Sequence, residues 1–248
     1  MAAKGDKGGG DLARGMDLLW GTADRPSRGP KPSMSVERIT GTAIEIADAE
    51  GLAAVSMQRI AAAFGFTTMS LYRYVPSKAE LVALMIDTAI GDRPDLESVP
   101  GGWRDRLADW ARQCLRLFVR HRWLIEATGG HRIMGPNELG WLDAALAVLA
   151  DAGFPPVEQH DAFLLLNGHV RSVAQNMTGA DRLRVDEWSA ALGERLRRHG
   201  DRYPALVAAM RGGGYSQPAA EPLEFGLRCL LDGLEKLLAE APGTPPGR

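Results

Sequence analysis

The chain has 248 residues, of which 45% are hydrophobic and 24% are charged, and its formal net charge is −2. This composition supports a globular fold with a sizeable core and excludes a disordered or fibrous chain. Because the net charge is slightly negative, contact with nucleic acid would require local segregation of basic side chains. Cys114 and Cys229 are the only cysteines. They provide neither a disulfide framework nor a multi-cysteine zinc site, and they fit a reducing cytosol.

No stretch approaches the roughly 20 apolar residues of a membrane span. Lys4 and Lys7 are not followed by an apolar segment, so the N-terminus does not resemble a secretory signal. We therefore expect a cytoplasmic protein with no membrane partner. Residues 1–33 are rich in Gly, Pro and basic residues and predict a flexible arm. Five apolar side chains in it are spaced for a short local turn: Leu12, Met16, Leu18, Leu19 and Trp20.

Helical periodicity begins at Ser35 and predicts a domain over residues 34–91. A first helix ends at Gly51, a short helix follows Ser56, and a second short helix runs from Thr67 to about Tyr74. Gly65 lies between the two short helices and suits a tight turn, because glycine adopts positive φ without steric cost. Ser77 with Glu80 predicts a capping box that opens a longer helix.

The second half is also helical. After a break at residues 92–102, apolar residues recur at helical spacing, and helices are expected at about 136–151, 157–177 and 223–238, with shorter pieces over 186–210. No stretch alternates with period two. The sequence thus predicts an all-α protein, with a second helical domain over 92–240 and a flexible tail at 241–248.

The two short helices separated by Gly65 form a helix–turn–helix pattern, and the distribution of charge along the sequence indicates its function. Residues 25–79 carry seven basic and four acidic side chains, or +3, and the rest of the chain carries −5. No acidic residue lies between Glu50 and Glu80, whereas Arg59, Arg73 and Lys78 do. A surface that faces phosphates avoids carboxylates, since attraction to the backbone supplies most non-specific affinity for DNA.

The segment from Gly51-Leu52 through Ser56-Met57-Gln58-Arg59-Ile60-Ala61 to Leu71-Tyr72-Arg73-Tyr74-Val75-Pro76-Ser77-Lys78 resembles the DNA-binding domain of the tetracycline-repressor (TetR) family. The resemblance covers about residues 35–90 and is nearer the tetracycline-repressor branch than relatives with His-Phe after the tyrosine. It implies that Thr67–Tyr74 is the recognition helix in the major groove and that Ala61, Phe64, Phe66 and Leu71 pack the small core. The DNA contacts it implies are Met57, Gln58, Thr67, Thr68, Met69, Ser70, Tyr72, Arg73, Tyr74 and Lys78.

Each of these residues has a structural alternative. Thr67 can be only an N-cap, Met69 can be buried, and Tyr72 and Tyr74 can be core aromatics. The basic residues of the arm either enter a neighbouring minor groove or belong to a solvated tail: Arg25, Arg28 and Lys31.

The resemblance also implies a homodimer through helices near 156–178 and 219–240, which reads the two half-sites of a near-palindromic operator. The leucine-rich stripe at 223–238 has burial within one subunit as its alternative. The aromatic and polar residues of the regulatory half predict a pocket for a small amphipathic effector. The candidate lining residues, each also open to a core role, are Trp110, Gln113, Cys114, Leu117, His121, Trp141, Phe163, Asn167 and Arg171.

We expect no cofactor, no intrinsic metal and no catalysis. Relatives near the tetracycline repressor can bind a drug–magnesium chelate through a histidine, and His121 or His131 lies in the comparable region, but no motif for a metal site or a phosphate-binding loop is present. The sequence predicts a DNA-binding transcriptional regulator, most simply a repressor released by a ligand. Two alternatives stay open: an adaptor or activator on the same fold, and a helical enzyme.

Overall fold

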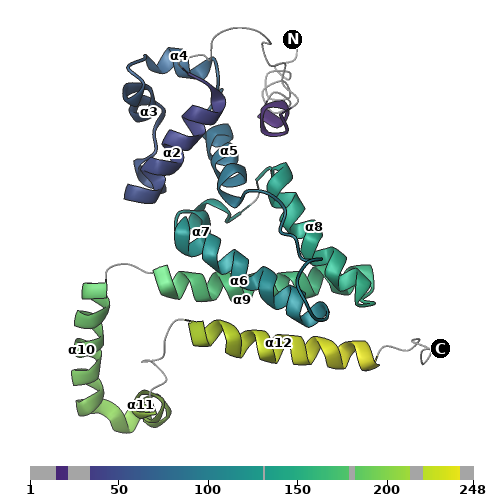
Figure 1. The fold of residues 1–248 in the computed structure, drawn as a ribbon. Coiled ribbons are helices and arrows are strands. Elements are labelled where there is room, and N and C mark those ends of the chain that lie inside the picture. Colours follow the sequence, from purple (N-terminus) through teal and green to yellow (C-terminus); the bar gives the residue numbers. More distant parts are fainter. Residues whose placement is uncertain (1–14, 22–33, 131, 179–181, 213–219, 241–248) are drawn as a thin grey trace, which may run out of the picture. The chain divides into compact units, whose positions relative to one another are not determined.

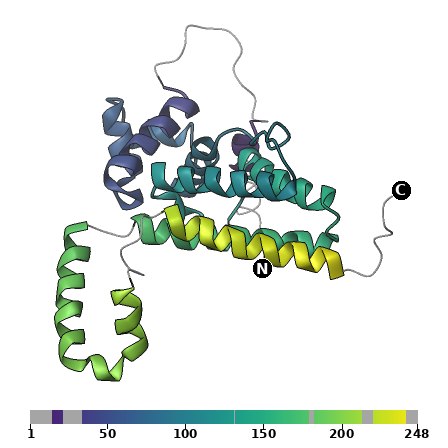
Figure 2. The same ribbon diagram turned by 60° about the horizontal axis from the view of Figure 1, so that its bottom comes forward.

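The computed structural model describes residues 15–21, 34–130, 132–178, 182–212 and 220–240. Within these ranges the chain is helical and contains no strand, which confirms the all-α prediction. The chain divides into two compact units, residues 1–163 and 164–248, and Figures 1 and 2 show the helices of each.

The first unit begins with the predicted helix–turn–helix. Its helices are α2 (Val36–Glu50), a 3-10 turn (Leu52–Ala54), α3 (Met57–Ala63), α4 (Thr68–Tyr72) and α5 (Lys78–Ile90). Polar side chains cap the four α-helices: the Oγ atoms of Ser35 and Ser56, for example, accept the backbone N–H groups of Arg38 and Arg59. Gly65 has φ +70° in the turn between α3 and α4, a conformation that favours glycine.

The regulatory helices of this unit are α6 (Trp103–Arg120), α7 (Leu124–Ala127), α8 (Pro136–Asp151) and the start of α9 (Pro156–Thr178). The short α7 is an element that the sequence analysis did not predict. It follows α6 directly, and its Leu124 joins Trp123 in the core formed by the helix–turn–helix. α8 packs against both α5 and α6. The predicted domain boundary near residue 91 therefore lies inside a packed unit.

Part of the predicted N-terminal arm is structured. Residues 15–19 form one helical turn, and Leu19, only 8% exposed, belongs to the core of the helix–turn–helix. A flexible arm is therefore not the correct description of this stretch, whereas the short local turn predicted from its apolar residues is present, with Leu18 packed against the same core. Arg25, Arg28 and Lys31, the tail at 241–248 and His131 lie outside the described residues.

The second unit contains the rest of α9 with α10 (Arg182–His199), a 3-10 turn (Gly200–Arg202), α11 (Pro204–Arg211) and α12 (Ala220–Glu240). α9 and α12 lie side by side (Figure 2), and His169 Nε2 on α9 is 3.2 Å from the carbonyl oxygen of Leu223 on α12. α12 includes Pro222 in its first turn and begins three residues before residue 223, where the leucine pattern predicts its start.

Candidate nucleic-acid interface

Helix α4 is fixed by one buried residue and presents its first turn outward. Leu71 is fully buried in the domain core, whereas Met69 is 75% exposed. Thr67 is the N-cap: its Oγ1 accepts the backbone N–H of Ser70 at 3.4 Å and lies 3.1 Å from the Ser70 hydroxyl. Thr67 is exposed and Thr68 and Ser70 are half-buried. Thr67 therefore caps α4 and also stays exposed, and the alternative that Met69 is buried is wrong.

The end of α4 carries two tyrosines in different environments. Tyr72 is 41% exposed, whereas Tyr74 is half-buried against the domain core. Between them Arg73 is exposed and, among the described residues, forms no hydrogen bond or ion pair. Its guanidinium is available for a phosphate or for a guanine edge.

The N-terminus of α5 adds a second unpaired cation. Ser77 Oγ accepts the backbone N–H of Ala79 at 3.0 Å and donates its hydroxyl to the Glu80 carboxylate. Ser77 therefore caps the helix, but its bond goes to Ala79 rather than to the third helical residue that the predicted capping box uses. Lys78 is exposed and has no ion-pair partner in the part of the chain that the structure describes. A helix N-terminus beside a free ammonium group favours an anion such as a phosphate.

Helix α3 requires a correction. Gln58 is exposed, but Met57 is only 6% exposed and belongs to the core, so it is not available for DNA. At the first helical position after the Ser56 cap, its side chain fills space beneath the helix. Phe66, which was expected in the small core, is 41% exposed, whereas Ala61 is buried as expected.

The stretch between Glu50 and Glu80, which contains no acidic residue, includes one basic residue for which no DNA contact was predicted from the sequence. Arg59 on α3 forms a two-bond ion pair with Glu50, the last residue of α2; Arg59 Nη1 lies 2.8 Å from Glu50 Oε2. Both side chains are well exposed, and Arg59 lowers the pKa of the Glu50 carboxyl by hydrogen bonding to it. The sequence contained one signal for this pair, because Glu50 is the last acidic residue before Arg59.

Two polar contacts join the helix–turn–helix to the regulatory helices. Asp48 Oδ1 on α2 accepts from His121 Nδ1 at 2.8 Å and from Trp123 Nε1 at 2.7 Å. His121 is only 6% exposed. It was predicted to face an effector, but its ring is committed to α2 instead. This first contact fixes the α6–α7 junction to the helix that precedes α3.

The second contact fixes the end of α5. Asp87 Oδ1 accepts the backbone N–H groups of Asn137 and Glu138 at 2.9 and 3.1 Å, and so caps the N-terminus of α8. A Cβ atom on Gly135 would lie 2.2 Å from Asp87 Oδ1, so this approach requires glycine. Burial raises the pKa of the Asp87 carboxyl, and the two N–H groups partly oppose that rise. Trp141 Nε1 also donates to Asp92 O at 2.8 Å.

The predicted effector residues of the first unit lie mainly in the interior. Trp110 is 2% exposed, donates its Nε1–H to Trp141 O, and meets Phe163 edge-on with ring centroids 5.6 Å apart. Cys114 is buried, and this burial raises the pKa of its thiol. Gln113 donates to Asp109 at 2.7 Å, and Leu117 packs against the helix–turn–helix core. In the second unit, Asn167 and Arg171 are half-buried on α9.

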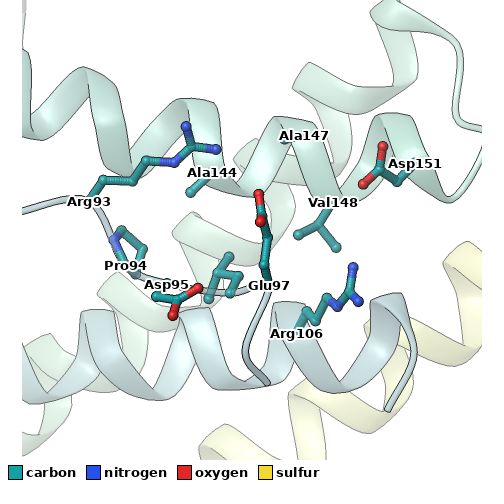
Figure 3. Close-up of a pocket in the computed structure, with 10 residues that line it drawn as sticks. Arg93, Pro94, Asp95, Glu97, Arg106, Ala144, Ala147, Val148 and Asp151 are labelled. Atoms are coloured by element: carbon teal, nitrogen blue, oxygen red, sulfur yellow. The ribbon is translucent and has the colours of Figure 1, made fainter. Parts of the chain in front are cut away.

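A pocket of about 320 Å³ opens between α6, α8 and the segment that links α5 to α6 (Figure 3). None of the predicted effector residues lines it. Arg106 lies beside it with a buried Nε that has no hydrogen-bond partner among the described residues. Charged side chains border it: Arg93, Asp95, Glu97, Arg106 and Asp151.

The described residues contain neither a metal-binding cluster nor a membrane-spanning helix. No group of three or more His, Cys, Asp or Glu side chains there is placed to hold a metal ion. None of the helices within those ranges is both long enough and apolar enough to span a bilayer.

Comparisons with known proteins agree with this arrangement of elements. The family model described as bacterial regulatory proteins, tetR family, matches residues 39–85, and the tetracyclin repressor-like C-terminal domain matches residues 94–238. The HTH-type transcriptional repressor DrrR1 of Streptomyces coeruleorubidus is 37% identical over 248 residues, covering 95% of this chain and 90% of its own.

Other relatives extend the likeness to structure. An HTH-type transcriptional regulator of Saccharopolyspora erythraea is 29% identical over 191 residues, or 76% of this chain and 80% of its own. The crystal structure of the TetR family protein ActR of Streptomyces coelicolor in complex with actinorhodin has a TM-score of 0.73 and 26% identity, covering 85% of this chain and 99% of that one.

Proposed function

We propose that this chain, which belongs to the tetR family of bacterial regulatory proteins, is a homodimeric repressor that acts in the cytoplasm on a near-palindromic operator. The observation that carries this proposal is the outward face of α4. Hydrogen-bonding side chains at the start of this helix are followed in the chain by Arg73 and Lys78, two exposed cations without ion-pair partners among the described residues, in a stretch that contains no carboxylate. Thr67, Thr68 and Ser70 supply donors and acceptors for base edges, and Met69 supplies an apolar contact for a thymine methyl group.

Gln58, Tyr72, Tyr74, Arg73 and Lys78 take the supporting roles in this proposal. The hydroxyl and ammonium groups bind backbone phosphates, which fixes the register of α4 on the duplex without reading sequence. Arg73 is at the end of α4 and reaches either a phosphate or a guanine.

One α4 helix reads one half-site, so specific binding requires two subunits about one helical turn of DNA apart. The second unit offers apolar surface for that assembly. On α9, Leu164 and Leu165 are 50% and 54% exposed, and on α12, Phe225 and Leu237 are 62% and 54% exposed. Large apolar side chains gathered on two helices support an interface between copies.

Phe225→Glu tests this assembly. We expect the variant to sediment as a monomer where the wild type is a dimer, because a carboxylate would be buried in an apolar contact. In footprinting of the DNA that flanks its own gene, the wild type should protect two patches one turn apart, and the variant neither. Tyr203→Glu, at an exposed position (49%) outside α9 and α12, is the matched control. A dimer that survives Phe225→Glu would contradict the proposed interface.

The proposal includes release by a small amphipathic molecule. The aromatic residues Trp110, Trp141 and Phe163 form an apolar interior between α6, α8 and α9, and the similar protein ActR was crystallised with actinorhodin. We therefore place the ligand in the class of polycyclic aromatic compounds with polar substituents. Such a ligand shifts the equilibrium only if it binds the DNA-free conformation more tightly. The contacts of Asp48 and Asp87 are the route by which the regulatory helices reposition α2 and α5.

Actinorhodin is a usable first probe of release. At saturation it should raise the dissociation constant for operator DNA about tenfold or more, within the usual range of coupling between sites. Recovery of the compound unchanged from the mixture distinguishes binding from turnover. If actinorhodin binds, as seen by quenching of tryptophan fluorescence, and operator affinity does not change, release by this ligand class is contradicted.

A further inference from the structure

We infer that Arg59 is a further contact to the DNA backbone and that Glu50 holds it in the free protein as a competitor of the phosphate. This inference rests on the proposed function, since it assigns an additional residue to the same DNA-binding surface.

The stretch between Glu50 and Glu80 contains three cations and no carboxylate. Arg73 and Lys78 are exposed and form no ion pair among the described residues, whereas Arg59 is bound through both guanidinium nitrogens to Glu50. The planar fork of an arginine fits a carboxylate and a phosphate in the same two-bond geometry. Glu50 therefore occupies Arg59 in the way that a DNA phosphate would.

The position of Arg59 is suitable for this role. It follows Gln58 in the first turn of α3, its side chain is 42% exposed, and its backbone N–H donates to the Ser56 cap. α3 packs against α4, as Figure 1 shows, so the first turn of α3 belongs to the same small domain as the recognition helix. A cation there adds to the charge that the duplex meets.

Fold stability does not account for Glu50. A negative charge in the last turn of a helix opposes the helix dipole, and α2 carries no basic residue in its last turn. The ion pair itself is exposed on both sides, with 42% and 51% of the side chains accessible. Exposed pairs of this kind contribute little to stability. Replacing the Glu50 carboxylate by a DNA phosphate as the partner of Arg59 consequently costs the protein little stability. The complex gains one contact to the DNA backbone.

The test is a double-mutant cycle on DNA binding. We expect Glu50→Gln to tighten binding to a 30-base-pair duplex about tenfold at 0.1 M salt, because Arg59 then meets the phosphate without a competitor. The slope of log affinity against log salt should steepen by about 0.9 per added contact, or about two per dimer. In an Arg59→Ala background, Glu50→Gln should change affinity less than about twofold.

Glu45→Gln is the matched control, because Glu45 is exposed on the same helix and has no ion-pair partner among the described residues. It removes the same charge and should leave affinity within about twofold of the wild type. Thermal unfolding of every variant checks that the domain stays folded. The inference is overturned if Glu50→Gln fails to tighten binding, or if its gain persists without Arg59.

The same titrations separate this inference from the proposed function. If the wild type binds and Lys78→Glu weakens that binding, the proposed function holds whatever Glu50→Gln does. If the wild type does not bind any duplex, the proposed function is contradicted, and the role of Arg59 is contradicted with it.

Discussion

Lys78→Glu is expected to weaken binding to operator DNA at least about 100-fold at 0.1 M salt, because each dimer loses two phosphate contacts and gains two repulsive charges. Lys78 is exposed at the N-terminus of α5 and has no ion-pair partner among the described residues. Arg73→Glu should have a similar effect. The neutral variant Lys78→Gln should flatten the salt dependence by a slope of about two per dimer. Fluorescence-anisotropy titrations at several salt concentrations measure both quantities.

Arg211→Glu is the control for this prediction. It reverses an exposed charge at the end of α11, outside the helix–turn–helix, and should leave affinity within about twofold. If Lys78→Glu and Arg73→Glu bind as the wild type does, the surface around α4 does not contact DNA. An adaptor that uses the same fold without DNA would then be the better description.

Asp87→Ala is expected to destabilise the protein by about 2 kcal/mol, because two half-buried N–H groups at the start of α8 lose their acceptor. Asp87→Asn keeps an acceptor oxygen without the charge, and at pH 7.5 it should be at least as stable as the wild type. Denaturant unfolding at fixed protein concentration measures the free energies. Asp143→Ala, which breaks only an exposed pair with Arg93, should cost less than about 1 kcal/mol.

The pH dependence of Asp87→Asn follows from the raised pKa of Asp87. Because burial raises this pKa in the folded state, the folded protein binds the proton more tightly than the unfolded chain. The stability that the wild type gains from proton binding at Asp87 is therefore fully present below the pKa of about 4 that this carboxyl has in the unfolded chain. It is lost as pH rises through the pKa of Asp87 in the folded state. The stability of Asp87→Asn relative to the wild type should be greatest at pH 7.5 and decrease toward pH 4. A loss in Asp87→Asn as large as that in Asp87→Ala would contradict this account.

Local features of the DNA-binding domain could be predicted from the sequence because their causes lie within a few residues. Ser35 and Ser56 are followed at once by helical periodicity, and Gly65 stands between two short helices. Most predicted DNA contacts lie on or just after the helix that the Thr67 cap starts. The helical spacing from that cap could therefore predict that they are at least partly exposed. Met57 was assigned wrongly because a position one residue after a cap is compatible with either face of the helix.

The contacts that tie the domain to the regulatory helices could not be predicted in this way. Asp48 meets His121 and Trp123 across more than 70 residues of sequence, and Asp87 meets α8 across about 50. No periodicity carries information over such separations, so the polar groups of His121 and Trp141 were assigned to an effector instead. The charged pocket beside Arg106 was missed because three segments far apart in sequence form it.

The central claim, sequence-specific binding of DNA by α4, is tested most directly by an anisotropy titration of the wild-type protein with the DNA that flanks its own gene. The account predicts saturable binding to one near-palindromic fragment, at least about 1,000-fold tighter than to a scrambled duplex of the same length. It also predicts that this preference persists at physiological salt. Weak binding that is equal on both duplexes and vanishes as salt rises would contradict the claim, because attraction to phosphates alone would then explain it.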